Sequence, residues 1–322
     1  MALEPQERSE KMTVVDKLAQ AEDMISPGVS ACIGCNVELT LRTVFKILGP
    51  NTIFAIPPGC MGGVGVVGWD KLSGAKCPVF FPLLDNSASM LAGIRLGLDA
   101  RGKKDVNVVA FAGDGATVDA GFQALSGAAE RGDRILYICY DNEGYMNTGY
   151  QRSASTAKGS WTSTTPVSRE GKGGKRQHRQ DFPMIMAMHD IPYMATASPA
   201  YIPDLVKKVE TAMKVESGLS YIHIWNPCLT GWHIKAEESI EVSRLSVTTN
   251  YYPLYEVRNR NFRINKKFKE PKPLTDMLSK IGKFKHLGDD EINELQDLVN
   301  KRYAFLEGME SVSDQSVFED IR

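Results

Sequence analysis

Asp114 and Asn142 are polar residues that each follow an apolar run, about 28 positions apart. In a parallel α/β sheet, ligands gather at the carboxyl ends of the strands. A carboxylate and an amide oxygen delivered there suit a hard cation that bridges phosphates. The flanking Gly113 and Gly115 would let the backbone approach a diphosphate closely. These residues predict a site for a divalent cation and a diphosphate, although a GDG triplet alone could be an ordinary turn of a βαβ unit.

The spacing resembles the thiamine diphosphate motif, in which GDG, a helical crossover and an asparagine follow one another. Here GDG occupies 113–115 after an apolar run, and the asparagine ends the next apolar run, which makes the pattern far more specific than GDG alone. The resemblance implies that Mg²⁺ is held by Asp114, Asn142 and the backbone carbonyl of Gly144. It also implies that the glycines at 113 and 115 contact the cofactor.

Four of the six cysteines lie beside turn-forming glycine or proline. They are Cys32, Cys35, Cys60 and Cys228. A C-x-x-C pair with two separated loop cysteines can hold Zn²⁺ or a [4Fe–4S] cluster, and spacing alone separates neither from a thioredoxin-like redox pair. Cys139 lies within an apolar run and is expected to be a core thiol, whereas Cys77 has no assigned role.

The thiamine motif favours the cluster over zinc. Decarboxylation of a 2-oxoacid on thiamine leaves an electron-rich species, and its oxidation requires that electrons leave the site. An iron–sulfur cluster beside the cofactor would provide that exit, whereas zinc has no redox chemistry. We therefore expect a [4Fe–4S] cluster at the four cysteines, with a structural zinc site and unligated thiols as the alternatives.

The elements that must position these residues alternate between strands and helices from about residue 31 to residue 235. Apolar runs at 106–112 and 135–140 are typical of strands buried on both faces, and helical spacing joins them over 119–131. Further strands are expected at 52–56, 78–84, 191–196 and 221–225, with helices at 36–48, 90–100, 183–189 and 202–215. The alternation predicts a single parallel sheet with helices on both faces.

Two stretches near the expected strand ends are rich in small residues. The turn at 85–89 would expose helix N–H groups to a phosphate, which makes Ser87 a candidate ligand, but the same residues also make an ordinary N-cap. The run at 61–68, MGGVGVVG, permits close backbone approach to a ligand or cluster. It could equally be a flexible loop.

The remaining segments suggest contacts outside the sheet. Residues 1–30 are polar and are expected to form an N-terminal extension that lies on the surface or over a neighbour. A long loop at 148–181 begins with hydroxyl-rich residues that could close over the cofactor. Its basic second half, 168–181, is read as a solvated loop, with a docking patch for an acidic partner as the alternative. Residues 236–322 carry little apolar core, so an arm packing on partner subunits is predicted.

Composition and charge exclude several classes of protein. The chain has 322 residues and a net charge of −1, so nothing draws it to nucleic acid or to anionic membranes. No apolar stretch approaches the roughly 20 residues of a membrane span. The polar N-terminus is unlike a secretory signal, so we expect a cytoplasmic location and no structural disulfides.

Beyond the motif, the chain resembles the β subunits of the 2-oxoacid:ferredoxin oxidoreductases, of the pyruvate synthase type. The matching segments are ACIGC at 31–35, GC at 59–60, AGDGATVDAGFQALSGAAERG at 112–132, ILYICYDNEGYMNTGYQRS at 135–153, IPYMATAS at 191–198 and NPCLTGW at 226–232. They cover most of residues 31–235 in order, and the central two are highly specific. The tail after about residue 240 matches only loosely.

The resemblance implies a cofactor set, partners and further site residues. Thiamine diphosphate and Mg²⁺ would be bound beside a proximal [4Fe–4S] cluster held by the four turn cysteines. Asn147 would lie beside the thiazolium ring and the substrate, and Gly59 beside the cofactor. The pyrimidine half of thiamine and its activating glutamate would belong to another chain, so α and γ- or δ-type subunits are expected, with ferredoxin as electron acceptor.

The substrate implied is a small 2-oxoacid, with pyruvate favoured and coenzyme A as the acyl acceptor in that case. The glycines after Cys60 depart from the expected pattern of the pyruvate enzymes and could reshape the pocket. Oxalate, which needs no coenzyme A, and an arylglyoxylate therefore remain open. The other functions considered are a non-redox thiamine-dependent decarboxylase or synthase with a structural zinc, and a non-catalytic regulatory subunit.

Overall fold

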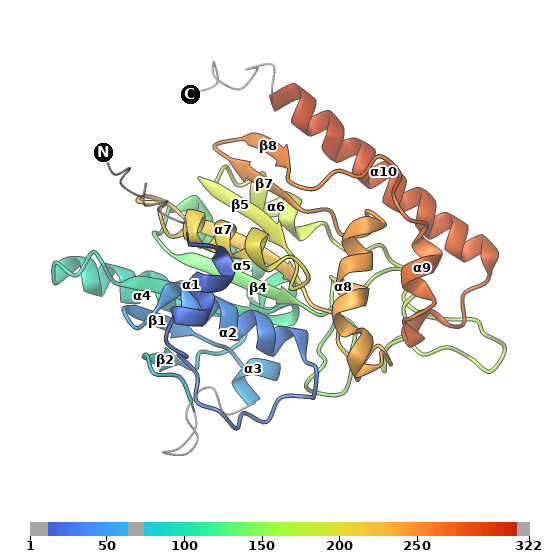
Figure 1. Cartoon of the computed structure of the whole chain (residues 1–322), viewed down its shortest axis with the longest axis horizontal. Coiled ribbons are helices and arrows are strands. Elements are labelled where there is room, and N and C mark those ends of the chain that lie inside the picture. The colour runs from blue at the N-terminus through green and yellow to red at the C-terminus, as the bar shows by residue number, and fades with distance from the viewer. Residues whose placement is uncertain (1–11, 64–73, 314–322) are drawn as a thin grey trace, which may run out of the picture.

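A single eight-stranded sheet forms the centre of the molecule (Figure 1). The computed structural model describes residues 12–63 and 74–313. The strand order is β2-β1-β3-β4-β6-β5-β7-β8. The strands are β1 (Thr52–Ala55), β2 (Val79–Phe80), β3 (Asn107–Gly113), β4 (Leu136–Asp141), β5 (Tyr193–Ala197), β6 (Ser220–Trp225), β7 (Tyr255–Arg258) and β8 (Asn261–Ile264). The expected strand over 78–84 is reduced to the two residues of β2.

The first six strands of this order, β2-β1-β3-β4-β6-β5, run parallel, as the alternation of strands and helices predicts. Because their connections are crossovers, the carboxyl ends of these strands all meet at one edge of the sheet. The last two strands, β7 and β8, are antiparallel additions. They come from the region after residue 235, which therefore extends the sheet and does not lie apart from it.

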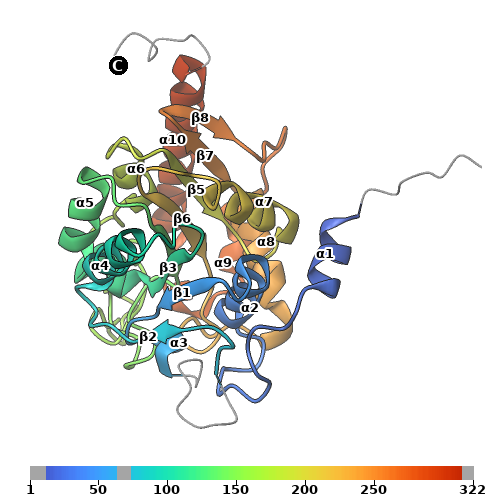
Figure 2. The same ribbon diagram turned by 90° about the vertical axis from the view of Figure 1, so that its left-hand side faces the viewer.

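Helices cover both faces of the sheet, as predicted (Figure 2). On one face lie α2 (Asn36–Leu48) and α7 (Ile202–Ala212), and on the other lie α4 (Ser87–Ala100), α5 (Phe122–Glu130) and α6 (Phe182–Ala187). The side chains of β3 alternate between the two cores, with Val109 and Phe111 on the α2 side and Ala110 on the α4 side. This period of two explains why the strand is apolar throughout.

The crossover after β3 differs from the single helix expected over 119–131. Gly115–Asp119 form a π-helix, η1, in which the Ala120 N–H donates to the Gly115 carbonyl at 3.0 Å. The helix α5 begins only at Phe122. Gly121 separates the two, and a Cβ there would come within 2.2 Å of the Ala116 carbonyl oxygen. The wide turn begins directly after Asp114, and π turns are frequent at functional sites.

The C-terminal region shares its core with the sheet domain. Apolar side chains of α8 (Ser239–Thr248), α9 (Leu274–Leu278) and the first half of α10 (Asp289–Ser313) pack with Trp225 and Trp232 in one buried cluster. The second half of α10 packs along β8 through Leu306 (Figure 1). The residues after 235 therefore share a core with the sheet domain, and their packing on partner subunits stays a prediction.

Smaller elements complete the chain. They are α1 (Val14–Gln20), α3 (Cys60–Gly63) and the 3₁₀ turns η2 (Ala236–Glu238) and η3 (Gly282–Phe284). Within the expected N-terminal extension, Met24 and Ile25 are buried in the core beside α2, because the backbone there pairs with residues 74–76. Residues 64–68 of the glycine-rich run lie outside the described residues. No helix in the described ranges is long and apolar enough to span a membrane.

Candidate functional site

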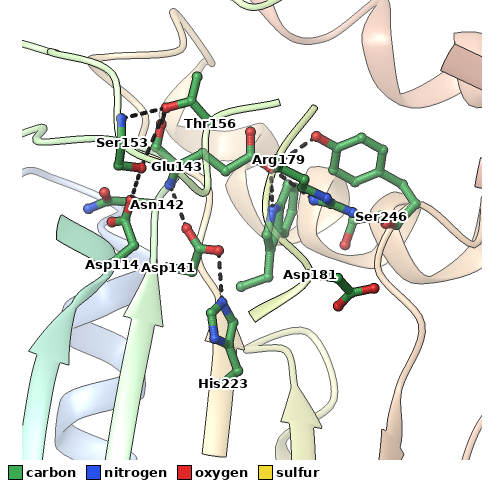
Figure 3. Close-up of polar contacts among 12 residues, drawn as sticks. Asp114, Asp141, Asn142, Glu143, Ser153, Thr156, Arg179, Asp181, His223 and Ser246 are labelled. Carbon is green, nitrogen blue, oxygen red and sulfur yellow. Dashed lines mark hydrogen bonds and ion pairs between the residues drawn. The ribbon is translucent and has the colours of Figure 1, made fainter. Parts of the chain in front are cut away.

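The register of β3 and β4 brings the two motif residues to adjacent strand ends. Gly113 pairs with Tyr140 in the parallel ladder, so Asp114 leaves the sheet beside Asp141 and Asn142. Figure 3 shows Asp114 and Asn142 next to each other above these two strands. The convergence predicted from the spacing of the motif is therefore present.

Three polar groups meet at this point. One terminal atom of the Asn142 amide lies 2.8 Å from the carbonyl oxygen of Gly144 and 3.1 Å from Oδ1 of Asp114. The other terminal atom lies 4.0 Å from Sγ of Cys60. Asn142 is 3% exposed and Asp114 1% exposed, so water reaches neither side chain freely.

A hollow with a cavity volume of ≈ 110 Å³ opens beside these groups. Eight of the residues predicted to form the site line it: Gly59, Cys60, Gly113, Asp114, Gly115, Asn142, Gly144 and Asn147. Asn147 is exposed at its mouth. Ser87 is not among the lining residues. It is the first residue of α4, which begins three residues earlier than expected. Its buried hydroxyl has no hydrogen-bond partner within the described ranges.

Glycine is required at two positions in the wall of this hollow. Gly59 has φ +152°, and a Cβ there would lie 2.8 Å from the Tyr140 hydroxyl. A Cβ at Gly115 would lie 2.3 Å from the ring of Tyr145, whose hydroxyl donates to the Gly115 carbonyl at 3.2 Å. Both glycines thus leave room for backbone and aromatic rings to close around the hollow.

Ser153 holds the second oxygen of Asp114. Its hydroxyl donates to Oδ2 at 2.5 Å, and its own N–H donates to the Thr156 hydroxyl at 2.9 Å. Burial and then the charge of Asp141 raise the pKa of Asp114 well above its ordinary value, while the hydrogen bond from Ser153 opposes that shift. Ser153 therefore orients the carboxylate and leaves Oδ1 directed at Asn142.

We expect Ser153→Ala to weaken thiamine diphosphate binding by about 10-fold, because a hydrogen bond to a charged group contributes roughly 1.5–3 kcal/mol. Equilibrium binding measured by calorimetry on the assembled oxidoreductase would test this. Ser160→Ala is the matched control, since that buried hydroxyl in the same loop has no hydrogen-bond partner among the described residues. Equal effects of the two substitutions would contradict the role of Ser153.

The loop at 148–181 lies over this edge of the sheet, and its hydroxyl-rich half is largely buried. The basic half was expected to be solvated, and Arg169, Lys172 and Arg176 are exposed. Lys175 is an exception at 2% exposed, because its Nζ donates to the carbonyls of Thr156 at 2.5 Å and Ala154 at 3.3 Å. Lys175 therefore links the two halves of the loop through buried hydrogen bonds.

Burial, and after it the charge of Arg152, lowers the pKa of Lys175 to about 8. The unfolded chain thus binds more protons than the folded chain between about pH 8 and the ordinary value of 10.5. The free energy of unfolding contributed by Lys175 should rise with pH across this window by on the order of 3 kcal/mol. Urea unfolding of the unaltered chain and of Lys175→Met measures it, and a pH-independent difference between them would refute it.

The four predicted cluster ligands come from three loops on the same side of the molecule. Cys35 precedes α2, Cys60 begins α3, and Cys228 follows β6. Gly34 packs against Leu229, which brings the C-x-x-C turn against the loop that carries Cys228. All six cysteines are free thiols.

The charges of these thiols influence one another. Burial, and then Cys228, Cys35 and Cys32 in that order, raise the pKa of Cys60 to about 12. Burial also raises the pKa values of Cys35 and Cys228. Across residues 12–63 and 74–313, no three His, Cys, Asp or Glu side chains are arranged to hold a metal ion. The cysteines therefore share one neighbourhood without converging on a single point.

Sequence reasoning missed several residues of the site. Tyr140 and Tyr145 form walls of the hollow, Ser153 contacts Asp114, and Glu143 forms a buried network behind it. The tyrosines lie inside the quoted motif segment, and Ser153 ends it, so the resemblance contained these residues without distinguishing them. Nothing in the local sequence indicates that Glu143 is buried.

Comparison with known proteins agrees with the geometry. Residues 77–224 match the family described as thiamine pyrophosphate enzyme, C-terminal TPP binding domain. Pyruvate synthase subunit PorB of Methanothermobacter thermautotrophicus is 40% identical over 87% of this chain and 96% of PorB. Ketoisovalerate oxidoreductase subunit VorB of Pyrococcus furiosus is 40% identical over 90% of this chain and 94% of VorB. The chain belongs to the β subunits of the 2-oxoacid:ferredoxin oxidoreductases.

Another relative is similar in sequence, and one solved structure is similar in fold. The β subunit is 43% identical, over 92% of its length, to the beta subunit of NADH-dependent phenylglyoxylate dehydrogenase from Aromatoleum evansii, and it spans 66% of that protein. It shares its fold, with a TM-score of 0.55 at 20% identity, with a chain of 2-oxoglutarate:ferredoxin oxidoreductase from Magnetococcus marinus. That match covers 65% of the β subunit and 67% of the other chain. The predicted family and fold class are thus confirmed, and other subunits of a multi-subunit oxidoreductase are implied.

Proposed function

We propose that this β subunit binds the diphosphate and Mg²⁺ of thiamine diphosphate for the oxidative decarboxylation of a small 2-oxoacid. The observation that carries the proposal is the convergence of Asp114, Asn142 and the Gly144 carbonyl within 2.8–3.1 Å. Adjacent oxygen ligands of Mg²⁺, each about 2.1 Å from the metal, are spaced at roughly this distance. The geometry therefore fits the ligand set that the motif resemblance implied.

The orientation of the Asn142 amide depends on what occupies this point. With no cation, the amide nitrogen would turn toward the two oxygens and donate to both. With Mg²⁺ present, the amide oxygen would face the metal and the nitrogen would face Cys60, 4.0 Å away. Both orientations occupy the same side-chain position, so the metal requires no rearrangement of the backbone.

The hollow is too small to enclose a whole cofactor. Pockets that bury a drug-sized ligand measure about 300–1,000 Å³, whereas this one measures ≈ 110 Å³. This supports the proposal that the pyrimidine half of thiamine is bound by an α-type subunit of the same enzyme. Gly59, Gly113 and Gly115 would contact the cofactor here, and Asn147 at the mouth would contact the substrate.

Bound thiamine diphosphate would supply the carbanion that adds to the 2-oxoacid and allows carbon dioxide to leave. The chain contributes placement of the diphosphate and metal, exclusion of water around Asp114, and polar groups at the mouth of the hollow. The four cysteines 32, 35, 60 and 228 are proposed to hold a [4Fe–4S] cluster, which can carry electrons singly to ferredoxin. The position of Cys60 in the wall of the hollow supports this pairing of cluster and cofactor.

For the 2-oxoacid substrate and the acyl acceptor, we propose a set of candidates. Relatives named for pyruvate, ketoisovalerate and phenylglyoxylate differ in the group attached to the 2-oxoacid carbon. Pyruvate with coenzyme A is our first choice, and an arylglyoxylate and oxalate are to be tested beside it. Six cysteines that form no disulfide suit a reducing, cytoplasmic setting.

The test is the visible spectrum of the oxidoreductase purified without oxygen through a tag on this chain. We expect the broad absorbance of iron–sulfur clusters, and bleaching by only those 2-oxoacids that are substrates. Pyruvate, ketoisovalerate, phenylglyoxylate and oxalate would be added separately, each with and without coenzyme A. A colourless complex that still decarboxylates would refute the redox function and favour a thiamine-dependent decarboxylase with a zinc site.

A further inference from the structure

Glu143 stands between the two residues that converge on Asp114, and it is fully buried. We propose that the ion pair of Glu143 with Lys283 is a positioning device that sets the affinity of the site for Mg²⁺ by holding Asn142 and Gly144 in place. This inference rests on the proposed function. It assigns a role in cofactor binding to the C-terminal region, of which no residue between 236 and 313 lines the hollow.

The carboxylate of Glu143 is satisfied by donors from four separate segments. Nζ of Lys283 lies 2.5 Å from Oε2, and Oε1 accepts hydrogen bonds from Trp225 Nε1 and the Tyr251 hydroxyl, each at 2.9 Å. Arg179 adds a longer contact of 3.4 Å. Figure 3 shows the Glu143 side chain directed into this network and away from Asp114 and Asn142. The Glu143 carboxylate is therefore hydrogen-bonded within the protein interior and is not placed to bind the metal.

The backbone at Glu143 needs such support. Its φ is +58°, in the left-handed region, which costs a non-glycine residue about 1–2 kcal/mol. The Glu143 N–H donates to Asp141 Oδ1 at 2.8 Å, and its carbonyl accepts from the Thr156 hydroxyl at 2.6 Å. This conformation turns Asn142 and Gly144 toward the hollow while Glu143 points into the protein. The strained turn is thus part of the site's geometry.

Lys283 also contacts Trp232, which is hydrogen-bonded to the same turn. Its Nζ lies 3.4 Å from the centre of the Trp232 ring, and Trp232 Nε1 donates to the Asn142 carbonyl at 3.0 Å. One lysine therefore supports both Glu143 and the peptide that precedes it. Without Lys283, only the 3.4 Å contact with Arg179 would remain to balance the buried charge of Glu143, so the turn would rearrange to solvate this carboxylate. We expect Asn142 and Gly144 to move with it.

The experiment measures thiamine diphosphate binding to the assembled oxidoreductase by calorimetry at increasing Mg²⁺ concentrations. We expect Lys283→Met to raise the half-saturating Mg²⁺ concentration by about 10-fold or more, as for residues that orient metal ligands. Lys208→Met is the matched control: that lysine is 1% exposed and paired with Asp204 at 2.7 Å, on α7, and does not line the hollow. Thermal unfolding of both variants reports their general destabilisation.

A similar change in unfolding temperature, with the Mg²⁺ shift confined to Lys283→Met, supports the inference. If the half-saturating Mg²⁺ concentration rises equally in both variants, or in neither, the inference is overturned. If Lys283→Met does not assemble, Tyr251→Phe removes a single hydrogen bond to Glu143 and should raise the half-saturating concentration about 3-fold. Its control is Tyr255→Phe, whose buried hydroxyl has no partner among the described residues. Absence of Mg²⁺-dependent binding in the unaltered complex would overturn the proposed function itself.

Discussion

Asp114→Ala is expected to abolish retention of thiamine diphosphate, with a rise of more than about 100-fold in its dissociation constant. The substitution removes the one carboxylate among the three groups that converge at the strand ends. A divalent cation would then be left with an amide and a carbonyl, which are neutral ligands. The measurement is the thiamine and magnesium content of the complex after desalting.

Two further variants separate loss of function from loss of folding. Asp114→Asn removes the charge but keeps the shape, and it relieves the repulsion between Asp114 and Asp141 in the absence of metal. We expect it to lose cofactor binding without a lower unfolding temperature. Asp133→Ala alters a carboxylate in the turn after α5, which does not line the hollow, and should retain the cofactor. Normal thiamine retention by Asp114→Ala would show that our metal site is wrong.

Cys60→Ser has the second large effect. It is expected to eliminate one [4Fe–4S] cluster, lower the iron content by about four atoms per β subunit, and reduce acceptor reduction to background. Thiamine diphosphate should remain bound, because Cys60 lines the hollow but supplies none of the three metal-directed oxygens. Iron analysis, bound thiamine and acceptor reduction are measured on the same preparation.

Cys77→Ser is the control for Cys60→Ser. Cys77 is a buried free thiol whose pKa is raised to about 11 by burial alone, with no neighbouring thiol contributing. It should leave iron content and acceptor reduction unchanged. If Cys60→Ser kept its iron and its activity, the four cysteines would not bind a cluster as we propose.

The sequence predicted the parts of the fold that depend on local pattern. The strands β3 and β4 are apolar on both faces, so their position and their parallel pairing followed from periodicity. The meeting of Asp114 with Asn142 followed from the rule that parallel strands end at one edge. These inferences needed only residues within about 30 positions of one another.

Features that depend on distant residues were not predicted. The π turn after Asp114 depends on packing of Gly121 against Ala116, and helical spacing alone does not distinguish it from an α-helix. Lys283 is 140 positions from Glu143, so neither residue indicated that its charge is buried. The C-terminal region seemed short of core in isolation because its apolar residues pack against Trp225 and Trp232 of the sheet domain.

The central claim is that Asp114, Asn142 and Gly144 of this chain hold the cation that binds the cofactor diphosphate. A structure of the purified oxidoreductase with thiamine diphosphate and Mg²⁺ tests it directly. We predict a cation about 2.1 Å from Asp114 Oδ1, Asn142 Oδ1 and the Gly144 carbonyl oxygen, with the diphosphate beside Gly113 and Gly115. A diphosphate and cation bound at another place, with these three oxygens facing only one another or water, would contradict the account.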